Sequence, residues 1–200
     1  MGVNNFNSIA PIYDFLARIV FGDSLDQITK QHLRSIGTSD RVLILGGGTG
    51  KLKAEIPQCH SNDYLDNSSQ MIESARIRSV KNNLQFIHGD ILEFEFDRSY
   101  DVIVCPFFLD CFNEGNLQKV IKKCKDVIKE DGKLIVIDFS SDHADRLLIK
   151  LMHSYFRMFT RLESQRLKNI NEYVLREGFQ VQEEKFLHRN MLFSRLYCRI

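Results

Sequence analysis

Tryptophan is absent from the 200-residue sequence, proline occurs only three times, and charge of neither sign dominates. Twenty-seven Lys and Arg residues face 26 Asp and Glu residues, so the formal net charge is only +1. A nearly neutral chain argues against a general nucleic-acid binder that is held by counterion release. No apolar run approaches the roughly 20 residues that span a bilayer, and no basic stretch followed by an apolar core opens the chain. We therefore expect a soluble, cytoplasmic protein with no integral membrane contact.

Cysteine is scarce as well and has no regular spacing. Five cysteines are spread between positions 59 and 198, and none is separated from another by the two residues that metal knuckles use. An odd number of scattered thiols is typical of reduced packing residues in a cytoplasmic protein. We expect neither a metal site nor a disulfide framework.

Apolar segments of two kinds alternate along the chain. Pro11 is expected to open one helix, and apolar residues with a 3.6-residue period predict a second helix from Leu25 to Ile36, which Gly37 ends. A further amphipathic helix is predicted from Asn116 to Lys129, followed by the turn "EDGK". Short runs rich in Val, Ile and Leu predict strands buried on both faces: "RVLIL", "NDYLD", "LQFIH", "YDVIVC" and "KLIVIDF".

The carboxy-terminal end of the chain has a different pattern. "FQVQEEKFL" and "MLFSRLYCRI" alternate in polarity and are joined by the short "HRN", which predicts an antiparallel hairpin. Strands that alternate with helices predict a mostly parallel sheet. The fold class is therefore α/β: a three-layer sandwich with a mostly parallel seven-stranded sheet and a C-terminal antiparallel hairpin.

Four glycines stand within five positions where the first predicted strand ends, in "RVLILGGGTG" (41–50). Ligands of open α/β sheets bind at such loops, where glycine lets the backbone approach a ligand closely. A phosphate-binding P-loop needs glycine and a hydroxyl residue where Leu45 and Leu52 stand, and the dinucleotide fingerprint needs its third glycine where Lys51 stands. Both alternatives weaken, and the pattern G-x-G-x-G is left.

The order of several motifs resembles the class I S-adenosylmethionine-dependent methyltransferases. These motifs are "VLILGGGTGKL", "YLDNSSQMIESAR", "FIHGDILEF", "YDVIVCPFFLDCF" and "GKLIVIDF". "FNSIAPIYDFL" is similar to the amino-terminal cap of the ubiquinone/menaquinone-biosynthesis-type members, a methyltransferase type 11-like group. The resemblance implies a Rossmann-like methyltransferase fold, the cofactor S-adenosylmethionine and the product S-adenosylhomocysteine.

The resemblance also assigns cofactor-binding residues. Asp66 takes the position whose carboxylate accepts the ribose hydroxyls, although it is also placed to cap a helix. Met71 would flank the adenine or belong to the core, and Asp90 with Ile91 would meet the adenine amino group or form a plain turn. Tyr13 belongs to a segment that covers the cofactor in that family, with ordinary helix packing as the alternative. The full set is Tyr13, Gly46, Gly47, Gly48, Gly50, Asp66, Asn67, Met71, Asp90, Ile91, Cys105 and Pro106.

One position departs from the family pattern. Members usually carry Asp or Glu two residues before the first glycine, near the cofactor's ammonium group, and this chain has Ile44 there. Backbone carbonyls or Asp110 are the candidate replacements. The departure also raises an alternative hypothesis, a catalytically inactive binding module with the methyltransferase fold, and the glycine loop keeps an NAD-type oxidoreductase as a third.

Methyl transfer needs a base only if the attacking atom must lose a proton. Asp110 is a weak candidate for a catalytic residue, and His143 and His153 are more simply explained as surface or core residues. Phe107 and Phe108 are expected to form apolar walls of the transfer cavity. The apolar segment 145–167 is expected to pack in the core, to form a homodimer interface, or to cover a small-molecule or lipid-like acceptor.

The resulting expectation is one methyltransferase domain over residues 1–200. It comprises an N-terminal helical cap (1–37), a cofactor-binding core (38–140), and substrate-side helices with the terminal hairpin (141–200).

Overall fold

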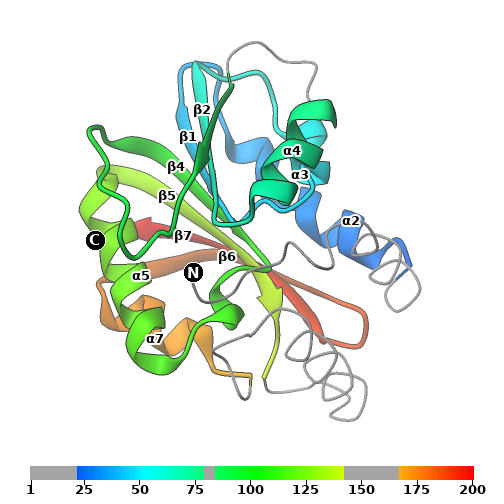
Figure 1. Ribbon diagram of the computed structural model, residues 1–200. Coiled ribbons are helices and arrows are strands. Elements are labelled where there is room, and N and C mark those ends of the chain that lie inside the picture. Colours follow the sequence, from blue (N-terminus) through cyan, green and yellow to red (C-terminus); the bar gives the residue numbers. More distant parts are fainter. Residues whose placement is uncertain (1–21, 79–83, 142–166) are drawn as a thin grey trace.

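A computed structural model describes residues 22–78, 84–141 and 167–200 of the chain (Figure 1). The predicted helix at Pro11 and the apolar segment 145–166 lie outside these residues. The division into cap, core and substrate-side parts therefore stays a prediction. Among the described residues, no helix is long and apolar enough to cross a membrane.

A seven-stranded sheet with the order β3-β2-β1-β4-β5-β7-β6 forms the centre of the molecule. The first five strands pair in parallel, and β7 lies antiparallel between β5 and β6. This arrangement confirms the predicted fold class. The strands are β1 (Arg41–Leu45), β2 (Ser61–Asp66), β3 (Leu84–His88), β4 (Tyr100–Pro106), β5 (Ile128–Phe139), β6 (Phe179–Leu187) and β7 (Leu192–Arg199).

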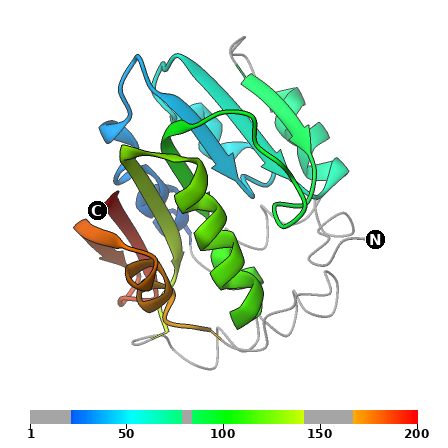
Figure 2. The same ribbon diagram turned by 90° about the vertical axis from the view of Figure 1, so that its left-hand side faces the viewer.

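Helices cover the sheet on both faces, as Figures 1 and 2 show. Successive strand residues point to opposite faces, so each strand feeds two cores. In β1, Val42 and Ile44 join one core, while Leu43 and Leu45 join the other. The first core is completed by α2 (Ser24–Lys30), α3 (Lys51–Glu55) and α4 (Ser69–Arg78), and the second by α5 (Glu114–Val127) and α7 (Ile170–Arg176).

Two predicted helices end earlier than their apolar periods suggest. The helix expected through Ile36 is α2, which ends at Lys30 and is followed by the short 3-10 turn η1 (Leu33–Ser35). The helix expected from Asn116 to Lys129 is α5, which ends at Val127. Ile128 already pairs with Tyr100 in the sheet, and the "EDGK" segment lies in a register shift within β5. Ile128, the last apolar residue of the helical stripe, is therefore a strand residue that pairs in the sheet.

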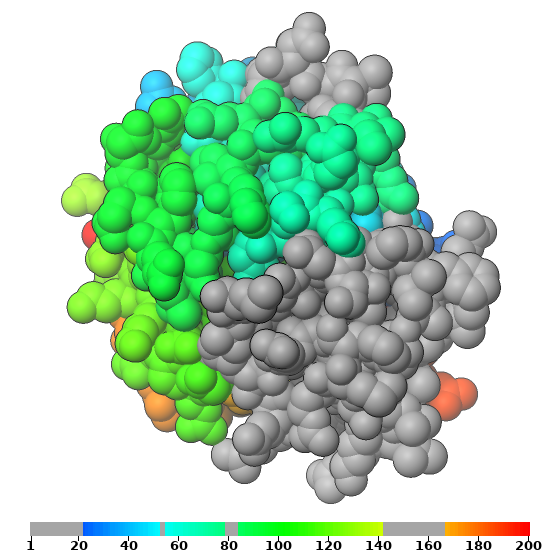
Figure 3. Space-filling view, viewed as in Figure 1, coloured from blue at the N-terminus to red at the C-terminus, as the bar shows by residue number. Residues whose placement is uncertain are grey.

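The predicted hairpin is confirmed by the pairing of β6 with β7 along their whole length. Residues 188–191 form the connection, and His188, Arg189 and Asn190 adopt positive φ values between 52° and 62°. This hairpin extends the sheet beyond β5. In the space-filling view of Figure 3, the chain from β2 to α5, coloured teal to green, forms most of the described surface on that face.

Candidate functional site

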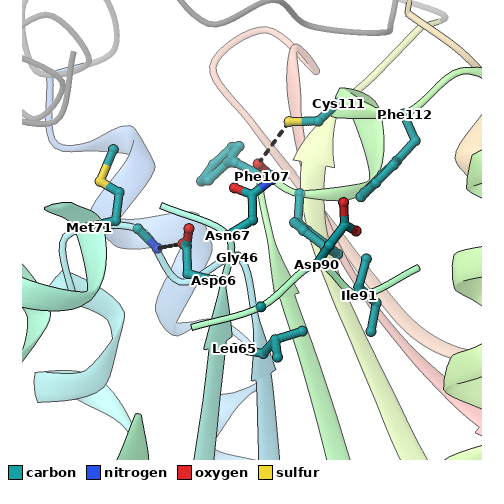
Figure 4. A pocket seen from close by; sticks show the side chains of 13 residues that line it. Gly46, Leu65, Asp66, Asn67, Met71, Asp90, Ile91, Phe107, Cys111 and Phe112 are labelled. Atoms are coloured by element: carbon teal, nitrogen blue, oxygen red, sulfur yellow. Dashed lines mark hydrogen bonds between the residues drawn. The ribbon is translucent and has the colours of Figure 1, made fainter. Parts of the chain in front are cut away.

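A cavity opens at the carboxyl ends of β1, β2 and β4, where the residues labelled in Figure 4 converge. It encloses about 590 Å³ of empty space, part of which is open to solvent. Most of its lining is apolar, and Asp66 and Asp90 supply its carboxyl groups. The lining residues are Gly46, Gly48, Leu65, Asp66, Asn67, Met71, Gly89, Asp90, Ile91, Phe107, Phe108, Cys111 and Phe112.

The glycine loop needs glycine for two reasons, a positive φ and a lack of space for a Cβ atom. Gly46 has a φ of 68°, and a Cβ atom there would lie 2.2 Å from Cδ2 of Phe108. At Gly47 the same atom would lie 2.5 Å from the ring of Tyr64, whose hydroxyl donates a 2.7 Å hydrogen bond to the Gly48 carbonyl. At Gly48, in contrast, a Cβ would have no atom within 4 Å. The loop is thus closely packed at Gly46 and Gly47 and open at Gly48.

Asp66 is the last residue of β2 and holds the loop to the next turn. Its Oδ2 accepts a 3.2 Å hydrogen bond from the Gly48 N–H, and its Oδ1 accepts a 2.9 Å bond from the Ser68 N–H. Burial raises the pKa of Asp66 to about 6, against the lowering effect of these two N–H groups and of His88. The carboxylate is therefore costly to keep charged without a further hydrogen-bond donor.

Four more predicted residues line the same cavity: Asn67, Met71, Asp90 and Ile91. Met71 of α4 is almost fully buried and lines the cavity, and its contact with the adenine stays a prediction. Asp90 accepts a 3.0 Å hydrogen bond from the Leu92 N–H, as a turn carboxylate does, and still lines the cavity beside Ile91. Figure 4 shows Asp90 and Ile91 on the loop after β3, across from Asp66.

Other predicted residues lie elsewhere. Cys105 is fully buried in the core beside Cys124. It lines neither this cavity nor the second cavity, which is described next. Gly50 packs against Ala75, with only 2.8 Å between the Ala75 backbone and a Cβ at this glycine. Tyr13, His143 and His153 lie outside the described residues.

A second cavity adjoins the other side of the glycine loop and encloses about 920 Å³ of partly open space. Gly46, Gly48 and Phe107 line both cavities. Gly47 and Pro106 line only the second, together with α2 and α3. Asp26 of α2 contributes a carboxyl group there, and sequence reasoning missed it because its helix is assigned to packing.

The wall of the first cavity beyond β4 is made by aromatic rings. Phe107 has a φ of 51°, a strained value for a bulky residue, and its ring packs 5.2 Å from that of Phe139. Phe108 and Phe112 form an edge-to-face pair with ring centroids 5.0 Å apart. Phe107 and Phe108 were predicted as walls. Phe112 and Cys111 were missed, although the apolar run "FFLDCF" is the signal that places them on one short turn.

Asp110 does not line either cavity. It belongs to the 3-10 turn η2 (Leu109–Cys111), and its carboxyl group is buried against that of Asp138 at the end of β5. Lys168, just before α7, attracts both carboxyl groups. Sequence reasoning missed Asp138 and Lys168. Within the described part of the chain, no group of three His, Cys, Asp or Glu residues could hold a metal ion.

Comparison with known proteins adds a family to this geometry. Residues 42–132 match the family model of a methyltransferase domain. Over 162 residues the chain is 32% identical to the demethylmenaquinone methyltransferase of Thermotoga maritima, which covers 76% of this chain and 67% of that protein. It is 24% identical over 209 residues to a ubiquinone/menaquinone biosynthesis C-methyltransferase of Pseudomonas fluorescens, covering 98% of this chain and 80% of that protein.

Solved structures share the fold at lower sequence identity. The N-methyltransferase NodS from Bradyrhizobium japonicum, in complex with S-adenosyl-L-homocysteine, has a TM-score of 0.68 at 15% identity, over 88% of this chain and 85% of that chain. A DhpI–SAH complex has a TM-score of 0.75 at 16% identity, over 97% and 93% of the two chains. At these identities the likeness concerns the fold alone.

Proposed function

The chain belongs to the class I S-adenosylmethionine-dependent methyltransferases of the ubiquinone/menaquinone-biosynthesis type, and we propose from this membership that it methylates a small-molecule or lipid-like acceptor by in-line displacement. The observation that carries the proposal is the joint lining of one cavity by the glycine loop, by Asp66 and by apolar walls. Such a cavity suits an adenosine attached to a sulfonium.

We assign the adenosine to the first cavity. Each Asp66 oxygen already accepts one backbone N–H bond and keeps a lone pair for a ribose hydroxyl. Asn67, Met71, Asp90 and Ile91 then surround the nucleoside. We place the nucleoside above Gly46 and Gly48. A side chain at Gly48 would project into open space and exclude the nucleoside. The assignment of these residues is a proposal for the cofactor-binding set, in which Gly50 and Cys105 act by packing.

The amino-acid tail of the cofactor is assigned to the second cavity, which shares Gly46, Gly48 and Phe107 with the first. Ile44, at the position of the family's usual acid, is fully buried and offers no charge. Asp26 lines the second cavity and is the carboxylate that we assign to the tail's ammonium group. Pro106 and Gly47 complete this part of the site.

When bound, the cofactor supplies a methyl group on a positively charged sulfur. The chain's own contribution is orientation and exclusion of water, because displacement at an activated carbon needs little covalent help. Phe107, Phe108 and Phe112 provide the apolar wall next to β4. Since Asp110 does not line the cavity, we give it no direct contact with the acceptor.

The acceptor we favour is a flat aromatic or quinone-like molecule. Support comes from the two relatives, a demethylmenaquinone methyltransferase and a ubiquinone/menaquinone biosynthesis C-methyltransferase, and from the aromatic wall of the cavity. Flat rings stack on aromatic side chains with a gain of about 0.5–1.5 kcal/mol beyond area burial. The attacking atom and the acceptor's tail are left to experiment.

Isothermal titration with S-adenosylhomocysteine tests the cofactor assignment. Wild-type protein should bind it, and Asp66→Ala should weaken binding by about 1.5–3 kcal/mol, the range for a hydrogen bond to a charged group. Asp97→Ala, which removes an exposed acid far from the cavity, is the matched control and should leave the dissociation constant unchanged. Binding of NAD instead of S-adenosylhomocysteine would contradict the proposal. An unchanged affinity of the Asp66→Ala variant would contradict it as well.

Turnover tests catalysis separately from binding. Wild-type protein with S-adenosylmethionine and a set of hydroquinones should release S-adenosylhomocysteine, measured by mass spectrometry. Firm cofactor binding without release for any acceptor in a metabolite extract would favour the binding-module alternative.

A further inference from the structure

The aromatic wall of the cavity is tied to the end of β5 by two hydrogen bonds that backbone N–H groups donate. The Phe107 N–H donates to the Ile137 carbonyl at 2.7 Å. Three residues later, the Asp110 N–H donates to Oδ2 of Asp138 at 3.2 Å. Asp110 is the middle residue of the 3-10 turn η2, and the wall residues Phe108 and Cys111 lie within two positions of it, so Asp138 is hydrogen-bonded to the segment that carries the wall.

Asp138 is fully buried, and both of its oxygens are occupied. Oδ1 accepts a 2.9 Å hydrogen bond from the Phe139 N–H, and Oδ2 accepts the bond from Asp110. In addition, the carboxyl group of Asp110 lies against that of Asp138. Two buried carboxyl groups in contact do not both ionise, so the pair shares one proton.

The charge of this pair is balanced by a buried lysine. Lys168 is only 8% exposed, and both carboxyl groups attract it. The other titratable groups that interact with the pair or with the lysine are the thiols of Cys105 and Cys111 and the carboxylate of Glu114. One shared negative charge opposite one ammonium group leaves the cluster close to neutral.

We propose that Asp138 is a positioning residue of the methyltransferase: through its proton-sharing pair with Asp110, balanced by Lys168, it fixes η2 and thereby the aromatic wall of the cofactor cavity. The inference rests on the proposed function only in taking this cavity as the cofactor site. The position of the wall affects the cofactor site because Phe108 packs directly against Gly46 of the glycine loop.

Loss of the shared proton is the perturbation that exposes this role. Burial, and then the negative charge of Asp110, raise the pKa of Asp138 well above its usual value. When the pH rises through that pKa, two negative charges face a single Lys168. Repulsion between the two carboxylates then displaces η2, and the affinity for S-adenosylhomocysteine falls at alkaline pH.

Two isosteric variants separate the two acids. In Asp110→Asn, the amide donates a hydrogen bond to Asp138 as a protonated carboxyl group does, but it has no proton to lose. In Asp138→Asn, only one side-chain oxygen is left to accept, so the bond from the Asp110 N–H is either lost or kept at the expense of the bond from the Phe139 N–H. Asp63→Asn is the matched control, because Asp63 is a buried acid that pairs with Tyr100 away from the cavity.

The experiment is titration with S-adenosylhomocysteine between pH 7 and 9.5, with each affinity expressed relative to that of Asp63→Asn. Wild-type affinity should fall more than that of Asp110→Asn as the pH rises. Asp138→Asn should bind at least tenfold more weakly than wild type already at pH 7. Equal alkaline losses in wild type and Asp110→Asn, or wild-type affinity in Asp138→Asn, would overturn the inference while leaving the proposed function intact.

Thermal unfolding of the ligand-free proteins supplies a second test that does not need the cofactor. As the pH rises, wild type should lose more stability than Asp110→Asn, because burial raises the pKa of Asp138 in both proteins but the negative charge of Asp110 raises it further only in wild type. Parallel stability curves would overturn the proton-sharing pair even if no variant binds S-adenosylhomocysteine, and absence of binding by the wild type would separately refute the proposed function.

Discussion

Lowering the pH from 7 to 5 should weaken cofactor binding through Asp66. Burial raises the pKa of this carboxyl group to about 6 in the ligand-free protein. The ribose hydroxyls donate hydrogen bonds, so the bound state requires the ionised form. At pH 5 only about one Asp66 in ten is ionised, which weakens binding about tenfold, or about 1.4 kcal/mol.

The raised pKa of Asp66 predicts the opposite pH dependence for the stability of the ligand-free protein. The folded state holds the Asp66 proton more tightly than the unfolded chain does, because the pKa is raised from 3.8 to about 6. The stabilisation by the neutral acid is complete below about pH 4 and is lost as the pH rises through about 6. Relative to Asp66→Asn, wild type should therefore become less stable between pH 4 and 7, by about 3 kcal/mol at most.

Isothermal titration with S-adenosylhomocysteine at pH 5, 6 and 7 measures the first effect, because this ligand cannot turn over. Asp66→Asn should bind weakly and with little pH dependence in that range. His88→Gln serves as the control for the nearby histidine, whose charge also lowers the pKa of Asp66. A wild-type dissociation constant that agrees within twofold at pH 5 and 7 would refute the assignment of the ribose to Asp66.

Three other changes probe the site and its support. Gly46→Ala should abolish S-adenosylhomocysteine binding in titration, because its Cβ would lie 2.2 Å from Phe108. Gly48→Ala should fold, because no atom lies within 4 Å of its Cβ, and should lose binding through obstruction and backbone strain. Asp26→Asn should weaken binding of S-adenosylhomocysteine about three- to tenfold, less than Asp66→Ala does, because Asp26 is exposed to solvent; an unchanged affinity would leave the tail's ammonium to backbone carbonyls. Burial lowers the pKa of His32, so this residue should make the protein less stable as the pH falls below 6.5, and His32→Gln should remove that slope in thermal unfolding at pH 7.5 and 5.5.

The sequence predicts the sheet well because buried parallel strands leave a strong local signal. Consecutive apolar residues such as Val42 to Leu45 are needed when each face of a strand meets a helix layer, and both layers are present. Helix ends are predicted less well. Ile128 fits the apolar stripe of α5 equally well as a helical residue, and only its pairing with Tyr100 across the sheet makes it a strand residue.

Some residues of the candidate site are likewise marked by a local sequence pattern, and others are not. Asp66 and the glycine loop could be predicted, because strand ends gather at one edge of a parallel sheet and a motif marks each of them. Asp138 and Lys168 could not. They lie 28 and 58 residues after Asp110, and neither position carries a pattern in the sequence that distinguishes it from an ordinary strand end or a surface lysine.

The absence of an acid at Ile44 changes how the remaining charges must act. With that residue buried in the core, Asp66 is the carboxylate that ends a strand inside the cavity and touches the glycine loop directly. The cost of burying its charge is met in part by two backbone N–H groups, and we expect the ribose hydroxyls to meet the rest. Cofactor affinity should therefore depend more on Asp66 and on pH than in relatives with an acid at the position of Ile44. Ile44→Asp provides the comparison: because its side chain faces the packed core, the added acid should destabilise the fold in thermal unfolding without improving S-adenosylhomocysteine binding.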